Sequence, residues 1–279
     1  MMSEYKTILV HYDAGRTAPT RLDIALEIGA KFDAHVACLY ALSATPIPAY
    51  PYEAAKIVRE VQERVGAEML ETARRGYDEC VRRNGYQKAE WRTSSRDAVD
   101  AVALHARYAD LVVIGQKNEE WPSGVSKNFE RSVLLAAGRP VLVVPYAFER
   151  RPLGRQILVA WNSSREAARA VSGALPLLKQ ASHVHVIAFN PDESGVAHGQ
   201  EPGADVGLYL TRHGVKVTVS RHDAQDVDVG NQLLSRAFDV SADLIVMGAW
   251  GHSRLQEMVL GGVTRTILDS MTVPVLMAN

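Results

Sequence analysis

The feature that most constrains the fold of this chain is an internal repeat that spans nearly all of its length. Three apolar segments occur twice, in the same order: Ile8–Val10 and Ile157–Val159, Ala109–Gly115 and Ala242–Gly248, Pro140–Val143 and Pro274–Met277. The paired segments lie 149, 133 and 134 residues apart. Repeats of this length are far longer than the units of about 20–50 residues that stack into solenoids. The chain is therefore predicted to contain a duplicated domain.

Both halves alternate short β-rich runs with helical patterns. Strands are expected near 7–12, 35–41, 88–93, 110–114 and 140–144, and again near 156–161, 183–189, 215–221, 243–247 and 273–278. Helices are expected near 17–32, 53–84, 96–107 and 127–137, and near 164–181, 203–213, 228–240 and 262–270. Continuously apolar strands that alternate with helices are typical of parallel βαβ units. The predicted class is α/β, with two doubly wound, open parallel-sheet, Rossmann-like domains in tandem. Their predicted bounds are 1–147 and 153–279, on either side of a charged, proline-bounded linker.

Composition limits the functional classes. The formal net charge of −1 argues against a general nucleic-acid binder, which would carry a basic stripe. Cys38 and Cys80 match no metal or redox spacing, so a reduced, cytoplasmic setting is expected. The sequence shows neither a signal-peptide pattern nor an apolar run long enough to span a membrane.

A glycine-bearing loop in the second half is the best candidate site. It follows the apolar run Leu244–Met247 and leads into a predicted helix, the order in which backbone N–H groups can face a phosphate. Glycine allows a close approach and positive φ, although tight turns use it for steric reasons alone. The candidate phosphate-binding residues are Gly248, Gly251, Gly261, Gly262 and Thr264.

These features together resemble a tandem universal stress protein, a family with a fold like that of the adenine nucleotide alpha hydrolases. Its nucleotide-binding members carry the loop G-x2-G-x9-G-[Ser/Thr], whose glycines and hydroxyl hold ATP phosphates. An aspartate after the first strand and the residue that closes the second strand contact the nucleoside. By position, the resemblance implies nucleoside contacts at Asn162 and Asn190. It also implies ATP or another adenine nucleotide as ligand, with Mg²⁺ as a candidate accompanying ion.

The sequence departs from the family pattern in both halves. In the second half, Gly262 replaces the motif's hydroxyl residue and Asn162 replaces its aspartate, which removes a charge but keeps a hydrogen-bonding amide. The first half keeps the aspartate, Asp13, but its loop has lost the glycines and gained carboxylates that would repel phosphate. Asp13 is therefore interpreted as part of a vestigial site, although Lys117 and Lys127 could partly compensate.

Other residues allow weaker functional interpretations. His183 and His185 share one face of a predicted strand and could bind a metal, but sequence supplies no third ligand, and no metal site is assigned. Trp161 and Trp250 flank the two site-forming turns and could border an adenine ring or simply cover the loop. We find no established catalytic motif and assign no catalytic residue.

Three functions remain open. The first is a stress-response module regulated by an adenine nucleotide bound to the second half. The second is a scaffold that binds no nucleotide and acts through protein contacts. The third is a slow ATP hydrolase, for which Glu257 is the local candidate base.

Each repeat ends in a short apolar strand after a proline, and such an edge needs a partner. Separate chains of the family pair through this strand. We therefore predict that residues 141–144 pair antiparallel with 275–278 in an intramolecular pseudo-dimer with approximate two-fold symmetry. A further homodimer of the whole chain is possible.

Overall fold

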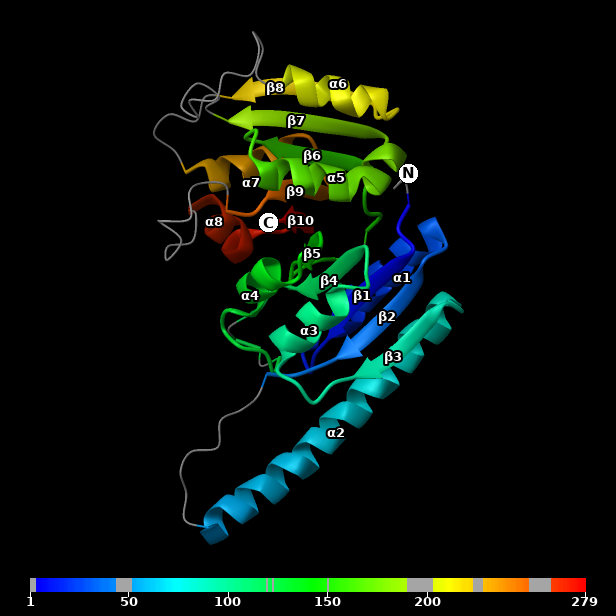
Figure 1. Cartoon of the computed structure of the whole chain (residues 1–279), viewed down its shortest axis with the longest axis vertical. Coiled ribbons are helices and arrows are strands. Elements are labelled where there is room, and N and C mark those ends of the chain that lie inside the picture. Colours follow the sequence, from blue (N-terminus) through cyan, green and yellow to red (C-terminus); the bar gives the residue numbers. More distant parts are fainter. Residues whose placement is uncertain are drawn as a thin grey trace. The chain divides into compact units, whose positions relative to one another are not determined.

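A computed structural model of the chain describes residues 4–43, 52–118, 120–121, 123–149, 151–189, 203–222, 228–250 and 262–279 (Figure 1). Contacts divide the chain into two compact units, Lys6–Ala137 and Gly138–Asn279, and Tyr5 belongs to the second. Strands and helices alternate in both, so the predicted α/β class is confirmed. The proposed domain bounds of 1–147 and 153–279 remain a prediction.

The N-terminal unit contains a parallel sheet with strand order β3-β2-β1-β4. Its strands are β1 (Thr7–Tyr12), β2 (His35–Tyr40), β3 (Ala89–Thr93) and β4 (Leu111–Gly115). Its helices are α1 (Ala18–Phe32), α2 (Tyr52–Asn84), α3 (Ala98–Ala106) and α4 (Phe129–Ala136). Helix α1 packs with α2, and α3 packs with α4. The chain adds β2 and β3 on one side of β1 and then crosses back to add β4 on the other side, so right-handed crossovers place these helix pairs on opposite faces of the sheet.

The C-terminal unit repeats this order and adds one strand. Its sheet runs β8-β7-β6-β9-β10-β5. Its strands are β5 (Val141–Val144), β6 (Gln156–Trp161), β7 (His183–Phe189), β8 (Val217–His222), β9 (Leu244–Gly248) and β10 (Val275–Ala278). Its helices are α5 (Arg165–Gln180), α6 (Ala204–Arg212), α7 (Val229–Asp239) and α8 (Gly262–Ser270).

Strand β5 belongs to this second unit because it pairs with β10. The pairing is antiparallel, with Leu142 opposite Leu276 and Val143 opposite Val275. The predicted antiparallel pairing of the two terminal strands is thus present. On its other side β10 pairs in parallel with β9, so both of its edges are occupied. The two-fold relation between the halves remains a prediction.

The repeated Ala-Asp pair before β4 and β9 has a structural role in each unit. Asp110 accepts hydrogen bonds from the backbone N–H groups of Lys6 and Thr7, at 2.8 and 2.9 Å. Asp243 likewise accepts the N–H of Gly154 at 2.7 Å, just before β6. A carboxylate that receives several backbone N–H groups fixes the start of the neighbouring strand. The repeat therefore preserves strand alignment at this position.

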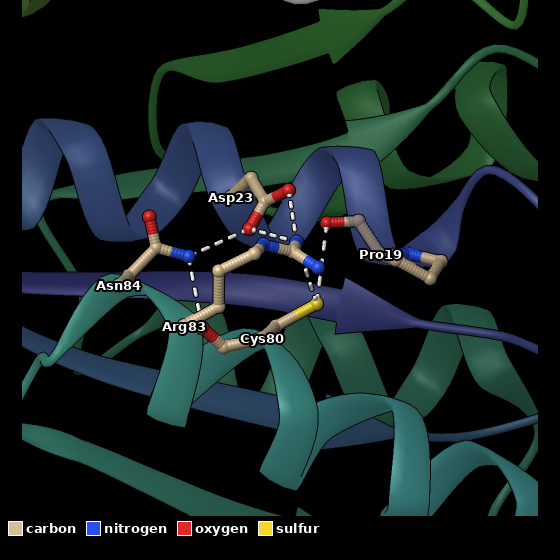
Figure 2. A network of polar contacts seen from close by, with 5 residues as sticks. All are labelled: Pro19, Asp23, Cys80, Arg83 and Asn84. Atoms are coloured by element: carbon tan, nitrogen blue, oxygen red, sulfur yellow. Dashed lines mark hydrogen bonds and ion pairs between the residues drawn. The ribbon is translucent and has the colours of Figure 1, made fainter.

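The C-terminal end of the long helix α2 is anchored to its own unit. Figure 2 shows Arg83 and Asn84 at the end of α2 gathered around Asp23 of α1. Arg83 Nη2 donates to both Asp23 carboxylate oxygens at 2.8 and 2.6 Å, and Asn84 Nδ2 donates to one of them at 2.7 Å. Nearby, Tyr77 of α2 lies 5.1 Å from the ring of Trp91 on β3. This end of α2 is fixed by both polar and aromatic contacts.

Within the described residues, none of the helices has the length and apolar character needed to cross a bilayer.

Candidate functional site

The turn after β1 in the N-terminal unit holds a buried ion pair. Asp13 is 5% exposed and accepts the backbone N–H of Gly15 at 2.8 Å. Its Oδ1 atom lies 2.8 Å from Nη2 of Arg21, a residue of α1 that is 2% exposed. The carboxylate that the sequence associates with a vestigial nucleotide site is therefore engaged by the protein's own guanidinium.

Arg21 also fills the space between the ends of β1 and β4. Its Nε donates to the His11 carbonyl at 3.3 Å, and its Nη1 donates to Thr17 Oγ1 at 3.3 Å. A Cβ atom added to Gly115, at the end of β4, would come within 2.9 Å of Arg21 Cδ. Glycine at 115 is thus required by the close approach of Arg21. The Arg21 side chain therefore occupies the position next to Asp13.

The loop after β4 closes over the same turn. The N–H of Ala14 donates to the Ser123 carbonyl at 3.1 Å, and the N–H of Ser43 donates to the Gly124 carbonyl at 2.8 Å. The Arg16 guanidinium stacks over the ring of Trp121. These contacts join the loop segments that follow β1, β2 and β4. The closed turn, together with the carboxylates of the loop, disfavours an anionic ligand in the N-terminal unit.

Burial and charge set the ionisation of this turn. Burial by itself would raise the pKa of Asp13, but the charge of Arg21, aided by His11 and the Gly15 N–H group, holds that pKa below its ordinary value. His11 is fully buried, and desolvation lowers its pKa from 6.5 to about 4, with Arg21 contributing and Asp13 opposing. Asp13 is thus anionic and His11 neutral near pH 7. The buried pair is electrically balanced.

The equivalent turn in the C-terminal unit carries an exposed amide in place of a buried carboxylate. Asn162, which follows β6, is exposed, and its Oδ1 accepts the N–H of Ser164 at 3.2 Å. Ser164 caps α5 by accepting the N–H of Ala167 at 3.0 Å, so the capping predicted at this helix start is present. The repeat offset that aligns Asp13 with Asn162 aligns Arg21 with Ala170, which is fully buried. The internal cation of the first half has no equivalent at this position.

The end of β9 approaches the first turn of α5. A Cβ atom on Gly248 would lie 2.5 Å from the Ala167 nitrogen and 2.8 Å from the Glu166 carbonyl carbon. Gly248 is therefore required for packing between strand and helix, whether or not it contacts a ligand. Trp250 follows with a left-handed φ of 57°, and its buried indole Nε1 has no hydrogen-bond partner in the described part of the chain. This donor lies at the start of the glycine loop.

The remaining predicted residues divide into two groups. Gly262, the first residue of α8, is exposed, and an added Cβ would meet no atom within 4 Å. Thr264 is buried, with 3% of its surface exposed. Asn190, Gly251 and Gly261 lie outside the described residues, as does Glu257. Helix α8 belongs to the same unit as β9 and α5.

The histidine pair has the predicted geometry. The rings of His183 and His185 lie on the same side of β7, with centroids 4.5 Å apart, and His183 Nε2 lies 2.9 Å from Thr218 Oγ1. No cluster of three or more His, Cys, Asp or Glu side chains suited to a metal occurs among the described residues. The described residues therefore supply no third ligand for a metal site at His183 and His185.

Arg21 is the important residue that sequence reasoning missed. A signal was available, because Arg21 lies next to Leu22 on the buried face of α1, between Ala18 and Ala25. An arginine among buried apolar positions needs an anion, and Asp13 lies only a few residues earlier in the chain.

Comparisons with known proteins agree with the duplicated fold. The model of the universal stress protein family matches residues 4–145 and 154–279. A universal stress protein from Synechocystis, Slr1230, is 25% identical over 60% of this chain, and the match spans 57% of that relative. The crystal structure of a universal stress protein from Archaeoglobus fulgidus has a TM-score of 0.64, with 18% identity over 98% of this chain and 96% of the other. A functionally unknown protein from Pseudomonas aeruginosa, PA1789, has a TM-score of 0.58, with 16% identity over 99% and 92% of the two chains.

Because the two matches of the family model together cover nearly the whole sequence, this chain belongs to the universal stress protein family.

Proposed function

We propose that the C-terminal half binds ATP or a related adenine nucleotide as a regulatory ligand. The observation that carries this proposal is the difference between equivalent turns: Asp13 is buried against Arg21, whereas Asn162 is exposed. The open first residue of α8, Gly262, supports it further, since helix N-termini present N–H groups and partial positive charge to phosphates.

The other residues fit an adenine nucleotide in distinct ways. The Asn162 amide can hydrogen-bond a ribose. The Nε1 of Trp250, which has no partner among the described residues, can donate to a ligand oxygen. Gly251, Gly261 and Asn190 complete the site through the family resemblance, and Thr264 remains a predicted contact. A Mg²⁺ ion would arrive with the phosphates. The bound nucleotide would change the shape of the loop or its affinity for a partner.

Opposite substitutions at Gly262 test the proposal. Gly262→Ser adds the hydroxyl of the family motif and should tighten binding about tenfold, the equivalent of about 1.4 kcal/mol, within the range for a hydrogen bond to a charged group. Gly262→Val places a branched side chain over the exposed N–H groups and should weaken binding. An added Cβ meets no neighbour, so both variants should fold.

The measurement is calorimetric titration of the full chain with ATP and AMP, with and without Mg²⁺, after mass spectrometry of any nucleotide released by heating. The same Val substitution at partly exposed Gly66 in α2, where an added Cβ also meets no atom within 4 Å, is the matched control. Absence of binding by wild type, or equal affinities in both Gly262 variants, would reject the proposal.

A scaffold that binds no nucleotide is the second candidate function. The closed turn around Asp13 and the buried position of Thr264 favour it. It predicts that protein contacts continue unchanged when adenine nucleotide is removed, which the same titrations followed by a binding assay would reveal.

A further inference from the structure

The first two thirds of α2 pack little against the rest of the N-terminal unit. Among residues 54–84 of α2, those that are buried are Ala73, Tyr77 and Cys80, all in the last part of the helix. Figure 1 shows the preceding turns extending away from the sheet of the N-terminal unit. From Tyr52 to Thr72 the helix spans about 30 Å at 1.5 Å per residue. This segment lacks the core contacts that usually hold a helix together.

An exposed apolar stripe runs along this segment of the helix. Ile57, Val61 and Val65 recur every four residues and are 61%, 43% and 44% exposed. Residues at this spacing lie on one side of a helix. β-Branched residues are poor helix formers, and Gly66 beside them is worse. Since isolated helices are marginal in water, this sequence favours a helix whose stripe is covered by a partner.

The charges beside the stripe point to a second copy of the same chain. When two such helices run antiparallel about Gln62, Glu60 of one copy lies opposite Arg64 of the other, and Lys56 lies opposite Glu68. In the described part of the chain, none of these four side chains forms an ion pair. Charged residues beside an apolar seam set partner choice and orientation in helix pairs.

We propose that the chain forms a two-fold symmetric homodimer through an antiparallel pairing of the α2 segments from 54 to 72, with Ile57, Val61 and Val65 as the seam. An isologous contact of this kind uses the same patch on both copies. Strand β10 is paired on both sides within the chain, so its edge is not available to a second copy. The α2 stripe provides a different surface, and the proposal is independent of nucleotide binding.

The first test compares two exposed positions on the same helix. Val61→Glu places a charge in the seam, whereas Ala67→Glu places the same charge about 120° away, by helical geometry of 3.6 residues per turn. Sedimentation velocity of the full chain over a wide concentration range should show dimers for wild type and Ala67→Glu. Val61→Glu should weaken the dimer by about tenfold or more. A monomeric wild type, or equal dimerisation of both variants, would overturn the proposal.

The second test addresses orientation. Glu60→Arg and Arg64→Glu should each weaken the dimer, because each brings like charges together across the pair, and the double variant should restore it. Val61→Cys should form a disulfide between chains under mild oxidation, whereas Ala67→Cys should not. The native thiols of Cys38 and Cys80 are buried and do not compete. Crosslinking at both positions, or a double variant that stays weak, would refute the antiparallel pairing.

Discussion

Replacing Arg21 by alanine should strongly destabilise the N-terminal unit. The side chains of Arg21 and Asp13 are almost fully buried, and Arg21 Nη2 lies 2.8 Å from Asp13 Oδ1, so the substitution leaves a buried carboxylate without its cation. Breaking a buried ion pair from one side costs about 3–5 kcal/mol. Against a total stability of about 5–15 kcal/mol for an ordinary domain, this loss would bring the unit close to unfolding.

The assay is urea unfolding followed by tryptophan fluorescence. Trp91 and Trp121 lie in the N-terminal unit, and Trp161 and Trp250 lie in the C-terminal unit. In a Trp161→Phe/Trp250→Phe background, the signal therefore reports the N-terminal unit. Arg21→Ala should lower its unfolding midpoint without changing the slope, as expected for a loss of stability alone.

A double-mutant cycle separates the ion pair from simple packing. Asn at 13 and Met at 21 replace the pair with neutral groups of similar size, so Asp13→Asn/Arg21→Met should lose less stability than the two single variants added together. The expected coupling is about 1–3 kcal/mol. A cost below about 1 kcal/mol for Arg21→Ala, the usual worth of an exposed pair, would show that the Asp13 turn does not depend on Arg21.

Three further predictions concern single residues. His11→Gln should flatten the pH dependence of unfolding between pH 6.5 and 4. In the wild type the folded pKa of His11 lies below its unfolded value, so the free energy of unfolding falls with decreasing pH by about 1.4 kcal/mol per pH unit. A variant that keeps this slope in denaturant titrations at several pH values would contradict the reasoning. Gly248→Ala should cost about 1–3 kcal/mol in thermal unfolding, because its Cβ would meet the Ala167 nitrogen at 2.5 Å, and an unchanged midpoint would count against that contact. Leu276→Pro removes a ladder donor from β10 and should speed hydrogen exchange at Leu142 of β5, and unchanged exchange there would argue against the pairing in solution.

Much of the fold could be predicted from the sequence because its signals are local. Continuous apolar runs such as Leu111–Ile114 identify strands buried on both faces, and the repeat requires the same order twice. The antiparallel pairing of β5 with β10 followed from the need to satisfy a sheet edge. The long pattern from 53 to 84 indicated α2, and the helix observed is Tyr52–Asn84.

The parts that sequence could not supply depend on contacts between distant segments. Gly115 and Gly248 end equivalent strands and look alike in sequence, yet one lies against the Arg21 side chain and the other against the backbone of α5. The spacing of glycines does not encode which neighbour approaches them. The sequence likewise names Thr264 as a candidate phosphate contact but does not indicate that this residue is buried. The periodicity of apolar residues thus predicts helices and strands well, but it does not predict which side chain or backbone segment packs against a given turn.

In each of the two equivalent turns, the residue after the first strand matches the residue at the aligned position of the following helix. A guanidinium buried at position 21 requires a carboxylate nearby, and Asp13 supplies it. With Ala170 at the equivalent position, a buried aspartate would lack a cation, and the neutral, exposed Asn162 avoids that cost. Retention of the aspartate in the first half is thus accounted for by Arg21 without any ligand. The lack of an aspartate in the second half is therefore no evidence against ligand binding there, because the absence of a buried cation explains it, and the Asn162 side chain that replaces it is exposed.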